Sequence, residues 1–157
     1  MYKTKNDIPE KSRVAAITLL NARLAEAVDL MHQAKQAHWN VKGPSFIALH
    51  KLFDEIVDAA EDYMDLLAER IVQIGGTAEG TIQVAAKRSA LKEYPLQMSA
   101  ERDHVEVLSS ALAAFGKSMR QAIDQSDELG DLDTADIFTE ISRGADKYLW
   151  FVEAHLG

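Results

Sequence analysis

Apolar residues recur at spacings of three and four along four long segments, the spacing that gathers side chains on one face of an α-helix. The segments span about residues 8–38, 45–74, 99–125 and 133–155. We therefore predict four long amphipathic helices. The residues expected on their buried faces are Val14, Ile17, Leu20, Leu24, Val28 and Met31 in the first helix, Phe46, Leu49, Phe53, Ile56, Ala60, Leu67, Ile71 and Ile74 in the second, Val105, Leu108, Leu112, Phe115, Met119 and Ile123 in the third, and Phe138, Ile141, Ala145, Tyr148 and Val152 in the fourth.

The pattern weakens between Gly75 and Met98, where we expect a connection with a short helix near Ile82–Lys87. A helix of about 30 residues is roughly 45 Å long, and a hairpin needs only a few residues. About 24 residues can instead run back along the whole bundle, since an extended chain spans roughly 3.3 Å per residue. The sequence thus predicts an all-α, ferritin-like four-helix bundle with one long crossover between helices two and three. We expect a single domain over residues 1–157, with residues 1–7 as a short N-terminal tail.

Composition narrows the chemistry that this bundle can carry. The chain has no cysteine, so a metal must be held by imidazole and carboxylate groups, which suits iron, zinc or manganese. There are 25 acidic and 17 basic side chains, a net charge of −8 that disfavours a nucleic-acid binder relying on its overall field. No apolar run approaches the ~18 residues of a membrane span, and the first residues lack a secretion signal. We therefore expect cytoplasmic residence and no membrane partner.

Five potential metal ligands lie at regular steps between residues 38 and 69: His38, His50, Asp54, Asp65 and Glu69. His50/Asp54 and Asp65/Glu69 are each four residues apart, so the members of each pair share a helix face. The two pairs are separated by about three turns, or roughly 16 Å along the axis. Because ligand bonds to iron or zinc are about 2 Å long, one straight helix cannot bring both pairs to one ion.

A symmetric dimer removes this difficulty. If two copies of the second helix lie antiparallel across a twofold axis, His50/Asp54 of one copy faces Asp65/Glu69 of the other, and two identical sites form. His38, at the end of the first helix, can join the His50 end. Each site would offer two imidazoles and three carboxylates, enough for a tightly bound iron and a weaker second one. The pattern alone leaves the alternative of a solvated acidic helix face with structural histidines open.

A second possible ligand set is Glu101 and His104, a Glu-x-x-His step on the third helix. Di-iron sites inside a bundle use two such steps and two further glutamates. Only one step occurs in this chain, so we interpret Glu101 and His104 as part of a polar first turn that Ser99 caps. His32 and His155 lack partners at ligand spacing and are interpreted as structural.

The run QAHWNVKGPSFIALHKLFDEI, followed by MDLLAERIVQIGG, resembles the Dps family, the DNA-binding proteins from starved cells or mini-ferritins. The family signature is His, eleven residues, His, three residues, Asp, ten residues, Asp, three residues and an acid, and all five positions match. The resemblance implies a hollow dodecamer with di-iron ferroxidase sites at twofold interfaces, formed by His38, His50 and Asp54 of one chain and Asp65 and Glu69 of its mate. It also implies that hydrogen peroxide preferentially oxidises Fe(II), that Fe(III) is mineralised inside the shell, and that DNA and cell are thereby protected from oxidative damage.

Further roles are expected for residues outside the five ligands. Trp39, beside His38, is a candidate trap for a stray oxidising equivalent, with packing at an interface as the alternative. The family has acidic pores at threefold axes, and Asp131 and Asp136 are the candidates here. One of Asp133 and Thr134 is expected to cap the fourth helix.

DNA binding is expected to be weak and salt-sensitive, or absent. Family members that bind DNA strongly carry a longer, lysine-rich tail, whereas Lys3 and Lys5 are the only charges in this tail before Asp7. Nucleoid association therefore stays open. Two functions remain to be separated: a peroxide-dependent ferroxidase and iron store, or a structural shell or DNA-compacting protein whose metal site holds an ion such as zinc.

Overall fold

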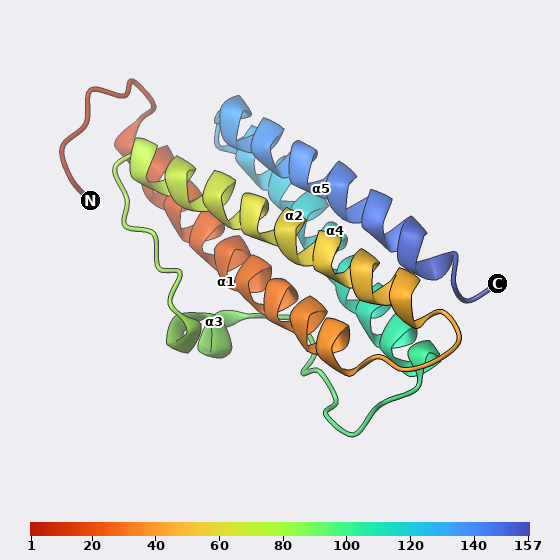
Figure 1. Cartoon of the computed structure of the whole chain (residues 1–157). Helices are drawn as coiled ribbons and strands as arrows, with labels where there is room; N and C mark the ends of the chain where they lie inside the picture. Colours follow the sequence, from red (N-terminus) through yellow and green to blue (C-terminus); the bar gives the residue numbers. More distant parts are fainter.

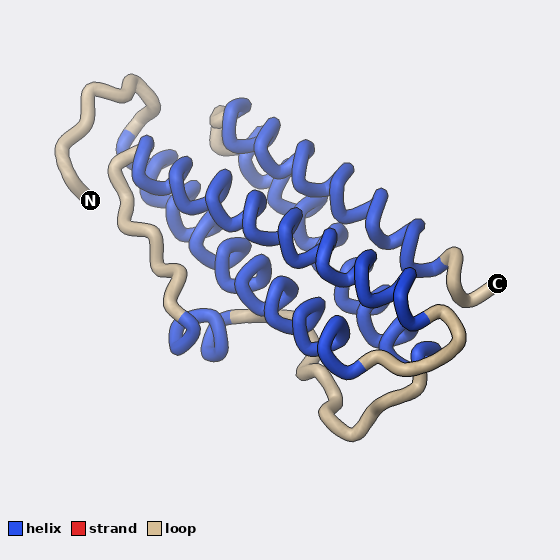
Figure 2. The backbone as a smooth tube through the Cα atoms, viewed as in Figure 1, coloured by secondary structure: helices blue, strands red, loops and turns tan.

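The computed structural model describes all 157 residues and contains five α-helices (Figure 1). Their bounds are α1 (Glu10–Asn40), α2 (Phe46–Gln73), α3 (Ile82–Arg88), α4 (Glu101–Glu128) and α5 (Leu132–Glu153). The tube in Figure 2 is helical throughout the bundle and contains no strand. A single β-bridge, between Lys42 and Ala100, joins the loop after α1 to the start of α4.

The four long helices form two antiparallel hairpins. Figure 1 shows α1 beside α2 and α4 beside α5, and the contacts within each of these pairs exceed those between the hairpins. The chain between α2 and α4 runs back along the bundle and carries α3, which packs on α1. The predicted ferritin-like bundle, with its long crossover and short helix, is therefore confirmed.

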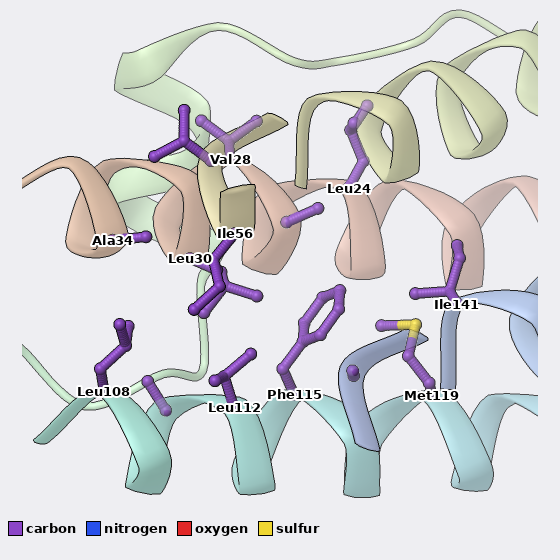
Figure 3. Packing of buried hydrophobic residues seen from close by; sticks show 14 of the residues in the cluster. Leu24, Val28, Leu30, Ala34, Ile56, Leu108, Leu112, Phe115, Met119 and Ile141 are labelled. Atoms are coloured by element: carbon purple, nitrogen blue, oxygen red, sulfur yellow. The ribbon is translucent and has the colours of Figure 1, made fainter. Parts of the chain in front are cut away.

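One hydrophobic cluster of 31 buried residues joins the helices, so both hairpins share one core. Figure 3 shows its centre, where side chains such as Leu30, Ile56 and Phe115 meet between the helices. Nearly all residues expected on the buried faces are buried or partly buried. Val14 and Phe46 are exceptions, with 47% and 41% of their surface exposed, because each lies near a helix start at the edge of the bundle.

The helix ends differ from the sequence expectations. Residues 126–128, which lie beyond the predicted third helix, are helical and extend α4, and Gly130 adopts a φ of 74° in the tight turn that follows. The cap of α5 is Asp131, whose side chain accepts the backbone N–H of Thr134. The prediction of Asp133 or Thr134 as the cap was wrong, and Ser99 does not cap α4, which begins after Ala100 without a side-chain cap.

Candidate metal centre

His38 and His50 lie face to face where α1 ends and α2 begins. Their ring centroids are 3.7 Å apart and the rings are inclined by 21°. The Nδ1 atom of His38 is 2.7 Å from the carbonyl oxygen of His50, and the Nδ1 atom of His50 is 2.9 Å from the carbonyl oxygen of His38. The two residues therefore hold each other through a reciprocal pair of hydrogen bonds.

These bonds determine which ring nitrogen can bind a metal. A carbonyl oxygen only accepts hydrogen bonds, so the Nδ1 atoms of His38 and His50 must carry the hydrogens. In the neutral rings both Nε2 atoms then keep a free lone pair, and the bond on the other nitrogen fixes the ring orientation, as is usual for histidine ligands of metals. The pair fits an ion that prefers imidazole, such as iron or zinc.

Asp54 lies one turn after His50, and its carboxylate is close to the histidines. Its Oδ1 atom is 3.7 Å from His38 Nδ1 and 2.5 Å from the ammonium nitrogen of Lys35. The hydrogen bond from Lys35, with a smaller contribution from the two histidines, lowers the pKa of Asp54 below its ordinary value. The sequence interpretation missed Lys35, although its position three residues before His38 places both on one face of α1.

Asp65 and Glu69 are exposed, one turn apart, in the second half of α2. Neither carboxylate forms an ion pair within the chain. No three acidic or histidine side chains of the single chain come close enough together to hold an ion. The structure thus has a histidine half, formed by His38, His50 and Asp54, and an acidic half, formed by Asp65 and Glu69.

Trp39 projects from the last turn of α1 beside the histidine half, with 67% of its surface exposed. Phe46, whose ring centroid is 5.1 Å from that of His50, and Ile47 are also exposed, by 41% and 61%. Three large apolar residues that are close in sequence to His38 or His50 are therefore exposed at the surface of the single chain.

The two pore candidates differ in their surroundings. Asp136 is exposed on α5, whereas Asp131 is 1% exposed. The carboxylate of Asp131 lies 2.6 Å from Arg70 Nη2 and accepts hydrogen bonds from the N–H and hydroxyl groups of Thr134 at 3.1 and 2.6 Å. Within the chain, Asp131 therefore caps α5 and ties it to α2 rather than presenting a free charge. Sequence reasoning missed this role because Arg70 is 61 residues away.

The N-terminal tail is bound to the end of α2. The backbone N–H of Tyr2 donates to the carbonyl of Gly75 at 3.0 Å, and the Tyr2 hydroxyl donates to the carbonyl of Val72. The Arg13 guanidinium bridges the carbonyls of Ile8 and Ile74 at 3.0 and 3.1 Å. Lys3 and Lys5 are exposed on this anchored segment.

Glu101 and His104 lie apart from the five predicted ligands and contact other groups. The Glu101 carboxylate accepts the backbone N–H of Ser45 at 2.8 Å. His104 is 1% exposed, and its Nδ1 atom is 2.6 Å from the hydroxyl of Tyr94. Both residues lie in the first turn of α4, as expected, and the structure adds that His104 is buried there.

None of the five helices combines the length and the apolar character that crossing a bilayer requires.

The sequence and the structure are both similar to those of known proteins. A model of ferritin-like domains matches residues 17–157. The chain is 46% identical over 155 residues to the DNA protection during starvation protein of Agrobacterium fabrum, covering 99% of this chain and 96% of that protein. It superposes on Dps from Microbacterium arborescens in the high iron form with a TM-score of 0.88 at 35% identity, covering 99% of both chains. Mycobacterium smegmatis Dps in its tetragonal form gives a TM-score of 0.94 at 29% identity, covering 99% of this chain and 94% of that one.

Proposed function

Because the chain belongs to the Dps family of ferritin-like proteins, we propose that it is a cytoplasmic ferroxidase and iron store that oxidises Fe(II), preferentially with hydrogen peroxide. Fe(III) is then mineralised inside a dodecameric shell. The observation that carries the proposal is the reciprocal pair of hydrogen bonds between His38 and His50, which leaves two Nε2 lone pairs available to a metal.

The complete site forms between two chains in this proposal. The histidine half of one chain meets the acidic half of its twofold mate, so His38, His50, Asp54 and the mate's Asp65 and Glu69 together bind Fe(II) as substrate. The free carboxylates of the acidic half and the exposed Trp39, Phe46 and Ile47 beside the histidine half support such an interface. Exposed apolar groups of this size are commonly covered by a partner.

The ligands suit the oxidation chemically. The three carboxylates balance the charge of Fe(II) and stabilise the harder Fe(III) product, while mixed ligation by imidazole and carboxylate leaves positions for peroxide. Two ferrous ions each give one electron to hydrogen peroxide, whose O–O bond breaks, and with two protons it becomes two water molecules. Ferrous iron and peroxide are removed together, so fewer hydroxyl radicals form near DNA.

Two supporting roles belong to the proposal. Trp39 is exposed beside the histidine half, where it either traps a stray oxidising equivalent or packs against the mate. An acidic pore would concentrate Fe(II) by focusing the field. Asp136 has the exposed carboxylate that a pore requires. Asp131 remains a candidate for the pore, but its carboxylate is bound to Arg70 within the chain.

The test is anaerobic loading with Fe(II), followed by peroxide, with iron followed across a sizing column. Ferric iron should elute with a large shell, and little should do so for the double variant His50→Ala plus Asp54→Ala. If the shell forms but oxidises iron no faster than buffer does, the ferroxidase proposal fails. The donor set would then serve another ion such as zinc, which accepts the same ligands.

DNA binding is proposed to be weak or absent. The anchoring of the tail through Tyr2 and the net charge of −8 both oppose a flexible basic contact with phosphates. A gel shift with linear duplex DNA should show no complex at physiological salt. A complex that persists there, and weakens on Lys3→Ala plus Lys5→Ala, would contradict this part of the proposal.

A further inference from the structure

The loop Val41–Ser45, which connects the two histidine-bearing helix ends, is bound to the start of α4. The N–H of Lys42 donates to the carbonyl of Ser99 at 3.0 Å, and the N–H of Glu101 donates to the carbonyl of Lys42 at 3.0 Å. Figure 1 shows this loop beside the beginning of α4. The backbone at the start of α4 and just before it thus fixes Lys42 of the loop.

The Glu101 side chain holds the α2 end of the same loop. Its Oε2 atom accepts the N–H of Ser45, the residue that precedes the first residue of α2. In a capping box a Glu or Gln three residues into the helix accepts this N–H, but here that position is Ala48, and the Ser45 side chain makes no capping bond. Glu101 supplies the missing group from another helix, and its negative charge is favourable at a helix N-terminus.

Gly43 provides the space for this carboxylate. A Cβ atom at residue 43 would overlap the side chain of Glu101, with the carboxylate oxygen as the nearest atom. The side chain therefore lies directly against the loop backbone, and the contact depends on residue 43 having no side chain.

His104, one turn after Glu101, lies at the α1 end of the loop. The backbone carbonyls of Asn40 and Met98 lie beside its ring, and Asn40 is the last residue of α1. The last carbonyls of a helix lack partners within the helix, so a buried polar ring nearby is a favourable neighbour. The Tyr94 hydroxyl binds Nδ1 of the ring and so orients it, while Nε2 is buried and makes no direct hydrogen bond.

We propose that Glu101 and His104 are positioning residues for the histidine half of the metal centre. The inference rests on the proposed function, because it assigns these residues to the site that would bind Fe(II). The reciprocal bonds between His38 and His50 require the end of α1 and the start of α2 to keep one relative position. From a single turn of α4, Glu101 binds the residue before α2 and His104 is buried beside the end of α1, and neither residue is a proposed metal ligand.

The experiment uses the assembled full-length protein and Co(II) as a probe whose absorption reports its ligands. Variants of residues that orient metal ligands typically lose ten- to hundredfold in affinity. We expect Glu101→Ala and His104→Gln to bind Co(II) about tenfold more weakly, and Glu101→Gln, which keeps an acceptor oxygen, to recover part of the loss. Glu106→Gln is the matched control, because Glu106 is an exposed acid on α4 that faces only Arg102, 3.6 Å away.

A second readout separates positioning from general stability. Hydrogen exchange of peptides covering residues 41–50 should speed up in Glu101→Ala, while exchange in the middle of α4 should match the control. The proposal is overturned if Glu101→Ala and His104→Gln both bind Co(II) within twofold of Glu106→Gln. If Glu101→Ala does not assemble, His104→Gln alone decides by the same criterion.

The same Co(II) measurement distinguishes a failure of the proposed function from a failure of the positioning role. If His50→Ala binds Co(II) as the unaltered protein does, the histidine half is not a metal site, whatever Glu101 does. If His50→Ala loses the Co(II) signal and the Glu101 and His104 variants keep it, the metal site stands and the positioning role is wrong.

Discussion

The chemistry of His38 and His50 depends on which ring nitrogen each hydrogen bond occupies. Spacing alone predicted that both could reach a metal. The structure adds that each Nδ1 atom is bound to the partner's backbone carbonyl, at 2.7 and 2.9 Å. Both Nε2 atoms are therefore oriented before an ion arrives, which reduces the ordering that binding would otherwise require.

Lys35 is expected to weaken metal binding at Asp54. Its ammonium group lies 2.5 Å from the Asp54 carboxylate, so a metal ion must displace it or share the oxygen. Lys35→Met keeps the length of the side chain and removes the charge. We expect Co(II) to bind several-fold more tightly to this variant, as measured by titration at low ionic strength.

The control for Lys35→Met is Lys51→Met, which removes an exposed lysine that forms no ion pair in the chain. Its Co(II) affinity should match that of the unaltered protein. Equal or weaker binding by Lys35→Met would show that the lysine orients the carboxylate instead of competing with the ion.

His104 should make stability depend on pH below neutrality. Burial lowers its pKa below the ordinary value of 6.5. The unfolded chain then takes up a proton at a higher pH than the folded protein does, so the free energy of unfolding falls as the pH drops from about 6.5 toward the folded-state pKa. His104→Gln should lose less stability than the unaltered protein between about pH 7.5 and 5.5, as measured by urea unfolding.

Glu26 also affects how the free energy of unfolding depends on pH, but in the opposite direction to His104. The pKa of Glu26 is raised, mainly by burial, so protonation on acidification favours the folded state. Glu26 is present in both proteins, and the difference between their profiles isolates His104. His155→Gln, which alters an exposed histidine, should leave the profile unchanged. Parallel profiles for His104→Gln and the unaltered protein would contradict the prediction.

At the scale of helices, the ends of the elements are set by distant partners. Asp131 caps α5 and also pairs with Arg70 of α2, and Glu101 of α4 binds the N–H of Ser45, the residue that precedes α2. Local sequence signals identified the helices, but they placed the cap of α5 at residue 133 or 134 and gave α4 a cap that it lacks. A cap supplied from another helix stabilises the element and also fixes how the two helices sit together.

Removing the Asp131 carboxylate should strongly destabilise the bundle. Asp131→Ala removes a helix cap, worth about 1 kcal/mol, and takes from Arg70, which is 6% exposed, the carboxylate nearest to its guanidinium. Breaking one side of a buried ion pair typically costs about 3–5 kcal/mol. We expect a loss of that order in the free energy of unfolding, measured with urea.

Asp133→Ala is the matched control for Asp131→Ala. The Asp133 side chain is 86% exposed and lies 3.9 Å from Arg70, so its removal should change stability little. Equal effects of the two substitutions would show that the pair between Asp131 and Arg70 contributes little to the fold.

At the scale of the whole molecule, the two halves of the proposed site lie at different places on one helix. His50 and Asp54 are near the start of α2, while Asp65 and Glu69 are in its second half. Within the chain no three such groups come together. In the proposed site, each chain therefore contributes one half to the site of its mate, and the proposal makes activity dependent on assembly.

Mixing two inactive variants tests this exchange directly. His50→Ala plus Asp54→Ala lacks the histidine half, and Asp65→Ala plus Glu69→Ala lacks the acidic half. A mixed twofold pair contains one complete site, so random coassembly should restore about a quarter of the sites. Peroxide-dependent Fe(II) oxidation should recover accordingly, whereas each variant assembled alone should stay inactive.

If the coassembled variants remain inactive while mass spectrometry shows mixed shells, the halves do not meet across the interface. The same result would follow for a site contained within one chain. Recovery to the expected level would exclude that arrangement, because neither variant chain has both halves.

The sequence by itself determined the four long helices, the crossover, the core-facing positions and the five ligand candidates. The helices and their core-facing positions follow from local periodicity, the ligand candidates from their spacing in the sequence, and the crossover from the length of the connection. Only the tertiary structure decided the contacts between residues far apart in the chain. Examples are the hydrogen bonds from Lys35 to Asp54, from Arg70 to Asp131 and from the Ser45 N–H to Glu101. These contacts depend on how the helices pack, and the periodicity of the sequence does not indicate which polar groups then meet.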